Sequence, residues 1–182
     1  MHPGRRRPAH ARRARRRPGG PVTGDLRLVG FEELSAGPLR GRLLAARDDF
    51  WHGTALPDDE VLRLHDPVFF HQLGGFGALA LTADDRDAGY LLGVVSADRL
   101  AVVHAVAVHR DLRARGVAAA LLDRFTGLAT RVGARVVQAV ALPGDAAARG
   151  LAEHLGASAA PSPGHGGPGE DRTVYTRGLP LP

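Results

Sequence analysis

The chain has 182 residues, 44% of them hydrophobic, and no cysteine. This length suits one domain with a tail, and the lack of cysteine excludes disulfides, zinc–thiolate sites and cysteine nucleophiles. The net charge of +5 belongs to the N-terminus, because residues 1–20 hold eight arginines and no acid, whereas the rest holds 16 basic and 19 acidic residues. No apolar run is long enough to span a bilayer, so we expect a cytoplasmic protein with no membrane partner.

Residues 1–24 form an arginine-rich segment with several prolines and glycines and no periodic apolar residues. This composition predicts a disordered tail, and it is not a signal peptide because no apolar segment follows the arginines. One interpretation is an arm that binds nucleic acid or an anionic surface. The other, which we favour, is an extension without a role, since basic runs that carry no motif are common. We therefore do not expect a nucleic-acid partner.

The first part of the body mixes one strand with helices. Asp25–Phe31 alternates as a short strand, and Leu39–Trp51 has apolar residues at helical spacing. A second, short helix begins near Pro57, where acidic residues fill the first turn, and it ends before Pro67. An aromatic cluster follows at Val68–Phe70.

Three strands are predicted next, at Phe76–Thr82, Tyr90–Ser96 and Leu100–Val108. The short polar turns between them make them antiparallel neighbours. A helix then runs to Val132, with apolar residues on one face, and Gly133 provides a C-terminal stop.

The C-terminal part alternates strands and a helix. Arg135–Leu142 is a predicted strand, and Ala146–Leu155 is a predicted helix closed at Gly156. A loop rich in proline and glycine is expected over Ser158–Gly169, and Arg172–Arg177 forms the last strand. The whole order predicts an α+β domain with a mixed central sheet.

The turn before the long helix carries the clearest chemical signal. It consists of Arg113, Ala114, Arg115, Gly116, Val117 and Ala118. A glycine-containing turn that leads into a helix N-terminus offers free backbone N–H groups and about half a unit of positive charge, which suits phosphates. The spacing is neither that of a P-loop nor that of a dinucleotide fold, so we predict a site for a diphosphate.

This turn resembles the acyl-CoA loop of the GNAT superfamily of N-acetyltransferases, Gln/Arg-x-x-Gly-x-Gly/Ala, and the preceding AVAVHRDL resembles the usual run-in of that family. The order of elements also matches from Asp25 almost to Pro182, and best from Phe76 to Gly156. The resemblance implies a mixed, largely antiparallel central sheet flanked by helices, in a single domain at residues 25–182. It also implies acetyl-CoA as co-substrate and direct attack by an amine acceptor in a ternary complex.

In the GNAT fold two central strands splay apart, and the pantetheine arm of the cofactor lies in the gap. The resemblance implies that Val106, Ala107 and Val108 supply its backbone hydrogen bonds. It also implies that an N–H near Val106 stabilises the oxyanion and that residues 113–118 hold the pyrophosphate.

His104 is the candidate general base, because an alkylamine with a pKa near 10 is mostly protonated at neutral pH and a neutral imidazole can accept its proton. Strand alternation predicts that His104 shares a face with Val102, Val106 and Val108. A buried histidine that only packs in the core is the alternative interpretation.

The general acid that is usual in the family is missing from this sequence. The run Leu-Tyr-x-x-x-Gly that is usual in the family has Ala152 in place of tyrosine, and the usual asparagine is Asp145. Tyr175 and His165 are candidates for the acid, and the alternatives are a water molecule or no acid at all. The missing tyrosine leaves open a domain that binds acyl-CoA without catalysis.

The acceptor is expected to meet residues 48–76 and the loop Pro161–Asp171. The first region carries several acidic residues, which would attract a cationic amine, although acids at helix starts and turns also serve as caps. Its aromatic side chains are candidates for a pocket wall or for the core. Its histidines lack the spacing of a metal site, so we expect no metal. We expect a small-molecule acceptor and leave a homodimer open.

Overall fold

The structure is a computed structural model that describes residues 26–71 and 76–181. The predicted tail at residues 1–24, together with Asp25, lies outside the described residues. Among the described residues, none of the helices has both the length and the apolar content needed to cross a bilayer.

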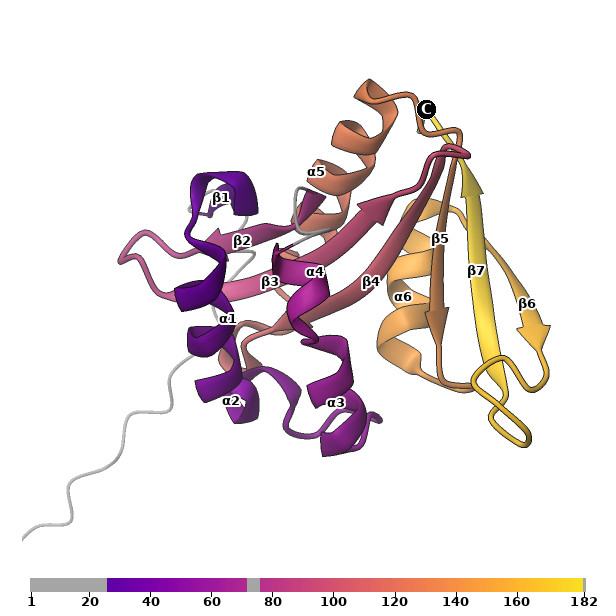
Figure 1. Cartoon of the computed structure of the whole chain (residues 1–182), viewed down its shortest axis with the longest axis horizontal. Coiled ribbons are helices and arrows are strands. Elements are labelled where there is room, and N and C mark those ends of the chain that lie inside the picture. Colours follow the sequence, from indigo (N-terminus) through magenta and orange to yellow (C-terminus); the bar gives the residue numbers. More distant parts are fainter. Residues whose placement is uncertain (1–25, 72–75, 182) are drawn as a thin grey trace, which may run out of the picture.

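Seven strands form one sheet in the order β1-β2-β3-β4-β5-β7-β6, and the elements can be followed in Figure 1. The strands are β1 (Arg27–Gly30), β2 (Ala78–Leu81), β3 (Asp87–Val95), β4 (Leu100–Val108), β5 (Val136–Ala141), β6 (Ser158–Ser162) and β7 (Arg172–Gly178). Of these strands in the described part of the chain, β4 and β5 alone pair in parallel. The prediction of an α+β fold with a mixed, largely antiparallel sheet is confirmed.

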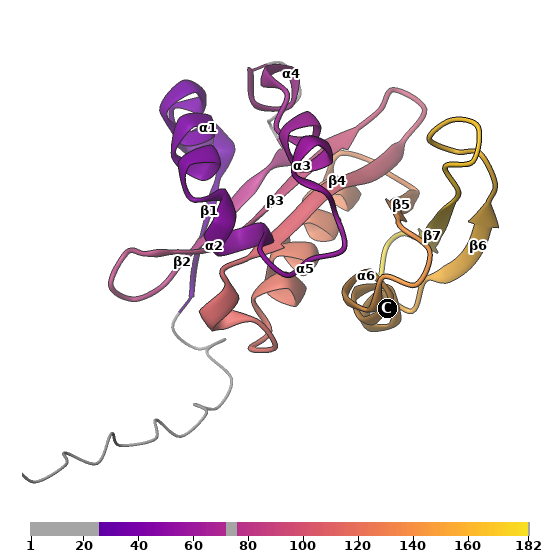
Figure 2. The ribbon, with the colours of Figure 1, turned by 90° about the horizontal axis from the view of Figure 1, so that it is seen from below.

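The helices pack on both faces of this sheet. They are α1 (Ala36–Ala45), α2 (Arg47–Trp51), α3 (Asp58–Leu64), α4 (Pro67–His71), α5 (Val117–Arg131) and α6 (Ala146–Leu155), with short 3-10 turns η2 (Phe31–Glu33) and η4 (Arg110–Leu112). Figure 2 shows α1 to α4 over one face and α5 and α6 over the other.

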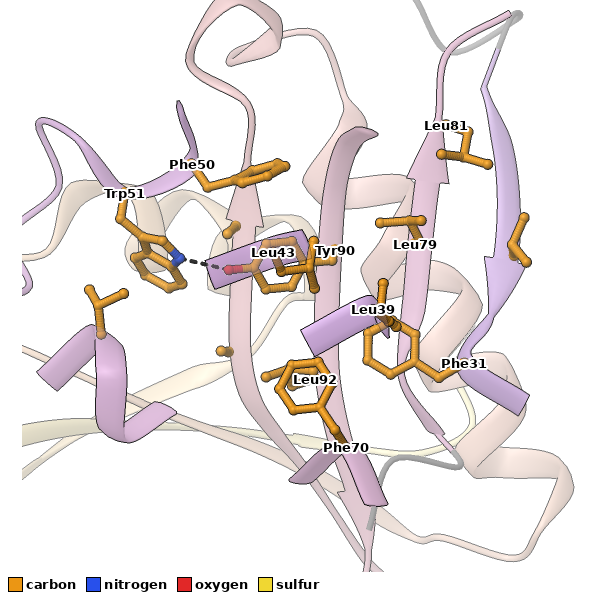
Figure 3. Packing of buried hydrophobic residues seen from close by; sticks show 14 residues of the cluster. Phe31, Leu39, Leu43, Phe50, Trp51, Phe70, Leu79, Leu81, Tyr90 and Leu92 are labelled. Atoms are coloured by element: carbon orange, nitrogen blue, oxygen red, sulfur yellow. Dashed lines mark hydrogen bonds between the residues drawn. The ribbon is translucent and has the colours of Figure 1, made fainter. Parts of the chain in front are cut away.

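The strand β3 separates two hydrophobic cores. Tyr90 and Leu92 pack with the helices α1 to α4, and Leu91 packs with α5. Successive residues of a strand point to opposite faces, so one buried strand serves both cores. Figure 3 shows the first core, where Phe50 and Leu43 surround Tyr90. The core next to α2 and α3 is the one that shapes the site.

Three local predictions were wrong. The single helix predicted over Leu39–Trp51 is two helices, because the chain leaves helical geometry at Ala46. The aromatic cluster forms the short helix α4, which was not predicted. The loop predicted over Ser158–Gly169 contains the edge strand β6, whose alanines and serines carry no strand pattern and whose Pro161 an edge position tolerates.

Candidate active site

The central feature of the site is a divergence between β4 and β5. Pairing between the two strands is limited to Leu100–Val103 of β4 and Val136–Ala139 of β5. Beyond Val103, β4 continues to pair with β3 as far as Val108. Figure 1 shows the strands meeting at one end and spreading apart at the other. Beyond Ala139, β5 remains paired with β7, so the sheet opens there instead of closing.

A cleft of about 480 Å³ fills this opening. One wall comes from α6, the other from the segment between α2 and α3, and the strands form its floor. Apolar residues dominate the lining, with few polar groups, as is typical of small-molecule sites.

The free edge of β4 faces this cleft. His109 donates its N–H to the carbonyl of Ala88 on β3 (N···O 2.9 Å). In antiparallel pairing every second residue bonds the same neighbour, so the backbone groups of Ala107 point to β3, and those of Val106 and Val108 point to the opening. Ala107 is therefore dropped from the cofactor contacts expected from the sequence, and Val106 and Val108 are kept.

A β-bulge lies at His104. Val103 pairs with Gly93 and Ala105 with Leu92, so His104 is the extra residue of β4. A bulge re-aims the side chains of its strand, and bulges are frequent beside active sites. Val106 packs with the α5 core, whereas His104 contacts α3 and α4. The prediction that His104 shares a face with Val106 and Val108 was therefore wrong.

The His104 ring is held by two contacts. Its Nε2 lies 3.1 Å from the carbonyl oxygen of Leu64, and its ring stacks on Phe69 at 3.5 Å between centroids. A carbonyl only accepts, so Nε2 carries the proton and Nδ1 is the acceptor in the neutral ring. Burial lowers the pKa of His104, an effect that the Leu64 bond partly opposes. His104 lines the cleft, and its lowered pKa favours the neutral ring.

The predicted phosphate turn lies past the end of β4. Gly116 is the N-cap of α5 with φ +84°, and Ala114 also has a positive φ of 58°. Within residues 26–71 and 76–181 no side chain bonds the first N–H groups of α5, so these groups can meet a ligand. Residues 114–118 do not line the cleft, whereas Arg113 does.

The two arginines of the turn differ. Arg113 donates from Nη2 to the carbonyl of Phe50 (2.7 Å) and from Nε to that of Val108 (3.4 Å), so it ties the end of α2 to β4. Arg115 forms no ion pair within the described part of the chain. Of the two guanidinium groups, Arg115 is the freer to meet a phosphate.

The two residues predicted as candidates for the general acid lie in different places. Tyr175, on β7 between Ala139 and Ala159, lines the same cleft as His104, and among the described residues its hydroxyl has no hydrogen-bond partner. His165 bonds Ser162 in an exposed loop and does not line the cleft. The structure thus brings Tyr175 and His104 to one cavity and leaves His165 outside it.

Two positions depart from the usual family pattern. Ala152 of α6 lies buried in the cleft wall, where the family run has tyrosine. Asp145 accepts hydrogen bonds from the N–H groups of Ala147 and Ala148 and so caps α6. Neither residue supplies a free acid to the cleft.

The acidic character expected of residues 48–76 is largely neutralised. Asp49 pairs with Arg110, and Asp59 pairs with Arg63. Of the acids in this region only Glu60 lines the cleft. The aromatic residues divide likewise, since Trp51 lines the cleft and the others pack elsewhere.

Sequence reasoning missed a buried network behind the cleft wall. The Nε1–H of Trp51 donates to the Tyr90 hydroxyl (2.7 Å), which lies 2.6 Å from Nε2 of His65 (Figure 3 shows the first bond). Nδ1 of His65 lies 2.7 Å from the carbonyl of Val61, so this nitrogen carries the proton and the tyrosine donates to Nε2. The partners are 25 and 39 residues apart, and no local pattern indicates them.

This network fixes the wall of the cleft beside His104. Burial lowers the pKa of His65 and raises the pKa of Tyr90, so both side chains are uncharged and every polar atom of the chain of bonds is satisfied. Leu64, whose carbonyl bonds His104, directly precedes His65.

The chain and its fold resemble known proteins. The Acetyltransferase (GNAT) family model matches residues 43–157. No curated protein matches. Similar solved structures include Ard1 from Thermoplasma volcanium (TM-score 0.64, 16% identity, 86% of this chain and 99% of that one). The ribosomal-protein-S18-alanine N-acetyltransferase from Escherichia coli is also similar (TM-score 0.62, 16% identity, 86% of this chain and 96% of that one).

A third similar structure is the phosphinothricin acetyltransferase from Sinorhizobium meliloti in complex with AcCoA (TM-score 0.62, 20% identity, 85% of this chain and 89% of that one). At these identities the structural likeness concerns the fold. The family model, however, spans well over half of the sequence. With its sheet opening between β4 and β5, the chain belongs to the GNAT family of acetyltransferases.

Proposed function

We propose that this protein transfers an acetyl group from acetyl-CoA to the nitrogen of a small amine in a ternary complex. The observation that carries the proposal is the cleft between β4 and β5. It joins a free backbone edge to a neutral histidine, and it begins beside a glycine turn that leads into α5.

The residues present suit acetyl-CoA in three ways. The edge of β4 offers the N–H groups of Val106 and Val108 and the C=O of Val106 to an amide-containing chain, since Arg113 already binds the Val108 carbonyl. The uncapped first turn of α5 offers N–H groups to a diphosphate. The apolar cleft excludes water from a thioester. The similar enzyme from Sinorhizobium meliloti was solved in complex with AcCoA, which supports the same donor.

Acetyl-CoA supplies a thioester carbonyl carbon for attack. The amine nitrogen forms a C–N bond to this carbon, the C–S bond breaks, and the sulfur leaves as a thiolate that takes up a proton. An N–H of the β4 edge near Val106 stabilises the oxyanion of the tetrahedral intermediate. Nδ1 of His104 accepts the proton that the amine loses, because Nε2–H is held by Leu64.

Tyr175 is proposed as the group that returns a proton to the thiolate. It lines the same cleft as His104, and its hydroxyl is not used by any side-chain bond in the described part of the chain. The cleft wall at Ala152, where the family pattern has tyrosine, supplies no alternative acid.

The test is steady-state acetylation of a panel of amines by the purified protein, with release of the coenzyme A thiol as readout. His104→Ala should lower kcat by about 10²–10⁴, as for loss of a general base, and coenzyme A binding should be unchanged. His154→Ala is the matched control, because His154 pairs with Asp123 outside the cleft. Equal activity of the His104 and His154 variants would contradict the assigned base.

A second candidate function is acyl-CoA binding without catalysis, and Ala152 favours it. Tight cofactor binding without turnover of any amine, and without an effect of His104→Ala, would select this alternative.

A further inference from the structure

Among the described residues four charged side chains line the cleft, and two of them bind the backbone around it. Arg113 binds the carbonyls of Phe50 and Val108, and Asp145 caps α6. The other two are Glu60 of α3 and Arg172 at the start of β7. Neither of these two side chains binds the backbone of the cleft wall, so we take them as the charges that meet an acceptor.

Glu60 and Arg172 pair with each other across the cleft. Nη2 of Arg172 lies 3.1 Å from Oε1 of Glu60, and the two residues come from elements 112 positions apart. The side chains are largely buried, with 15% of Arg172 and 22% of Glu60 exposed. A pair so placed is weakly screened by solvent, and its charges act strongly on a bound ligand.

Together with Glu170, the pair forms a group with one more negative than positive charge. Nη2 of Arg172 also lies 3.6 Å from Oε2 of Glu170, and its Nη1 donates to the carbonyl of Asp171 (3.1 Å). One guanidinium therefore serves two carboxylates. Oε2 of Glu60 has no partner among the described residues, so the group offers the cleft a carboxylate oxygen.

We propose that Glu60 is a specificity residue that selects acceptors with a second ammonium group, separate from the amine that is acetylated. This inference rests on the proposed function, because it names the acceptor class of that cleft. The free carboxylate oxygen of Glu60 accepts a charge-assisted hydrogen bond from the second ammonium. An anionic acceptor would have to displace two carboxylates from Arg172.

Three acceptors of similar length isolate this effect: 1,4-diaminobutane, butylamine and 4-aminobutanoate. They end in an ammonium, a methyl and a carboxylate group. Each is titrated calorimetrically into the full chain saturated with coenzyme A. Loss of a hydrogen bond to a charged group corresponds to about a 10- to 100-fold change in affinity, so the diamine should bind that much more tightly than butylamine.

Glu60→Gln keeps the shape and removes the charge, and it should bring the diamine and butylamine to similar affinity. Asp59→Asn is the matched control, since Asp59 lies on the same helix and pairs outward with Arg63. Circular dichroism checks that both variants fold. The Asp59 variant should keep the full preference for the diamine.

The outcomes separate the two proposals. Coenzyme A binding with no preference for the diamine, a preference that Glu60→Gln leaves intact, or tighter binding of 4-aminobutanoate overturns the role of Glu60 and leaves the proposed function standing. Failure to bind coenzyme A overturns both.

Discussion

The chain holds two tyrosines. Removing the hydroxyl of Tyr90 should destabilise the fold, whereas removing that of Tyr175 should leave its stability almost unchanged. The Tyr90 hydroxyl accepts from Trp51 and donates to His65 in a buried site. Tyr90→Phe leaves the Trp51 Nε1–H and the His65 Nε2 without a partner, whereas His65 Nδ1 keeps its bond to Val61. An unsatisfied buried polar group costs about 1–3 kcal/mol, so the free energy of unfolding should fall by about 2–4 kcal/mol.

Tyr175→Phe removes a hydroxyl that has no side-chain partner among the described residues, and the change in stability should stay within about 0.5 kcal/mol. Thermal unfolding followed by circular dichroism compares the two variants with the parent. At about 2–4 °C per kcal/mol for a chain of this size, the Tyr90 variant should unfold about 5–15 °C lower. Equal Tm values for the two variants would refute the network as a support of the cleft wall.

Three further predictions concern stability and binding. Burial lowers the pKa values of His65 and His104 from 6.5, so the unfolded chain takes up protons at a higher pH than the folded chain. The free energy of unfolding should therefore be highest above pH 6.5 and should fall as the pH drops below 6.5. Equal urea midpoints at pH 7.5 and 5.5 would contradict this. Gly93→Ala places a methyl group 2.5 Å from the Phe125 ring and should lower the free energy of unfolding by about 1–3 kcal/mol. Gly150→Ala adds a methyl group in open space on α6 and should raise the free energy of unfolding by up to about 1 kcal/mol. Urea unfolding compares the two variants. Gly116→Ala and Gly133→Ala both put a side chain at positive φ, and each should lower the free energy of unfolding by about 1–2 kcal/mol. In calorimetry, the Gly116 change should weaken coenzyme A binding and the Gly133 change should not.

The sequence predicted most of the sheet because its strands carry local signals. The apolar run Leu100–Val108 and the polar turns before it define β4 and its antiparallel neighbours, and the glycine turn marks the start of α5. The edge strand β6 has no such signal, because its pairing with β7 is decided by tertiary contact and not by its alanines and serines.

The site was predicted in part for a similar physical reason. His104, Tyr175, Val106 and Arg113 line one cleft, and their roles in binding and catalysis stay predictions. The bulge at His104 depends on the register against β3, which strict alternation cannot reveal. The partner of Glu60 lies 112 residues away. Pairing at that distance is a property of the fold and leaves no local trace in the sequence.

The central claim is that the opening of the sheet beside the Gly116 turn binds a coenzyme A thioester. Isothermal titration of acetyl-CoA into the purified chain tests it most directly. We expect saturable binding of one molecule per chain at micromolar concentrations. Absence of any binding heat at millimolar acetyl-CoA would contradict the claim.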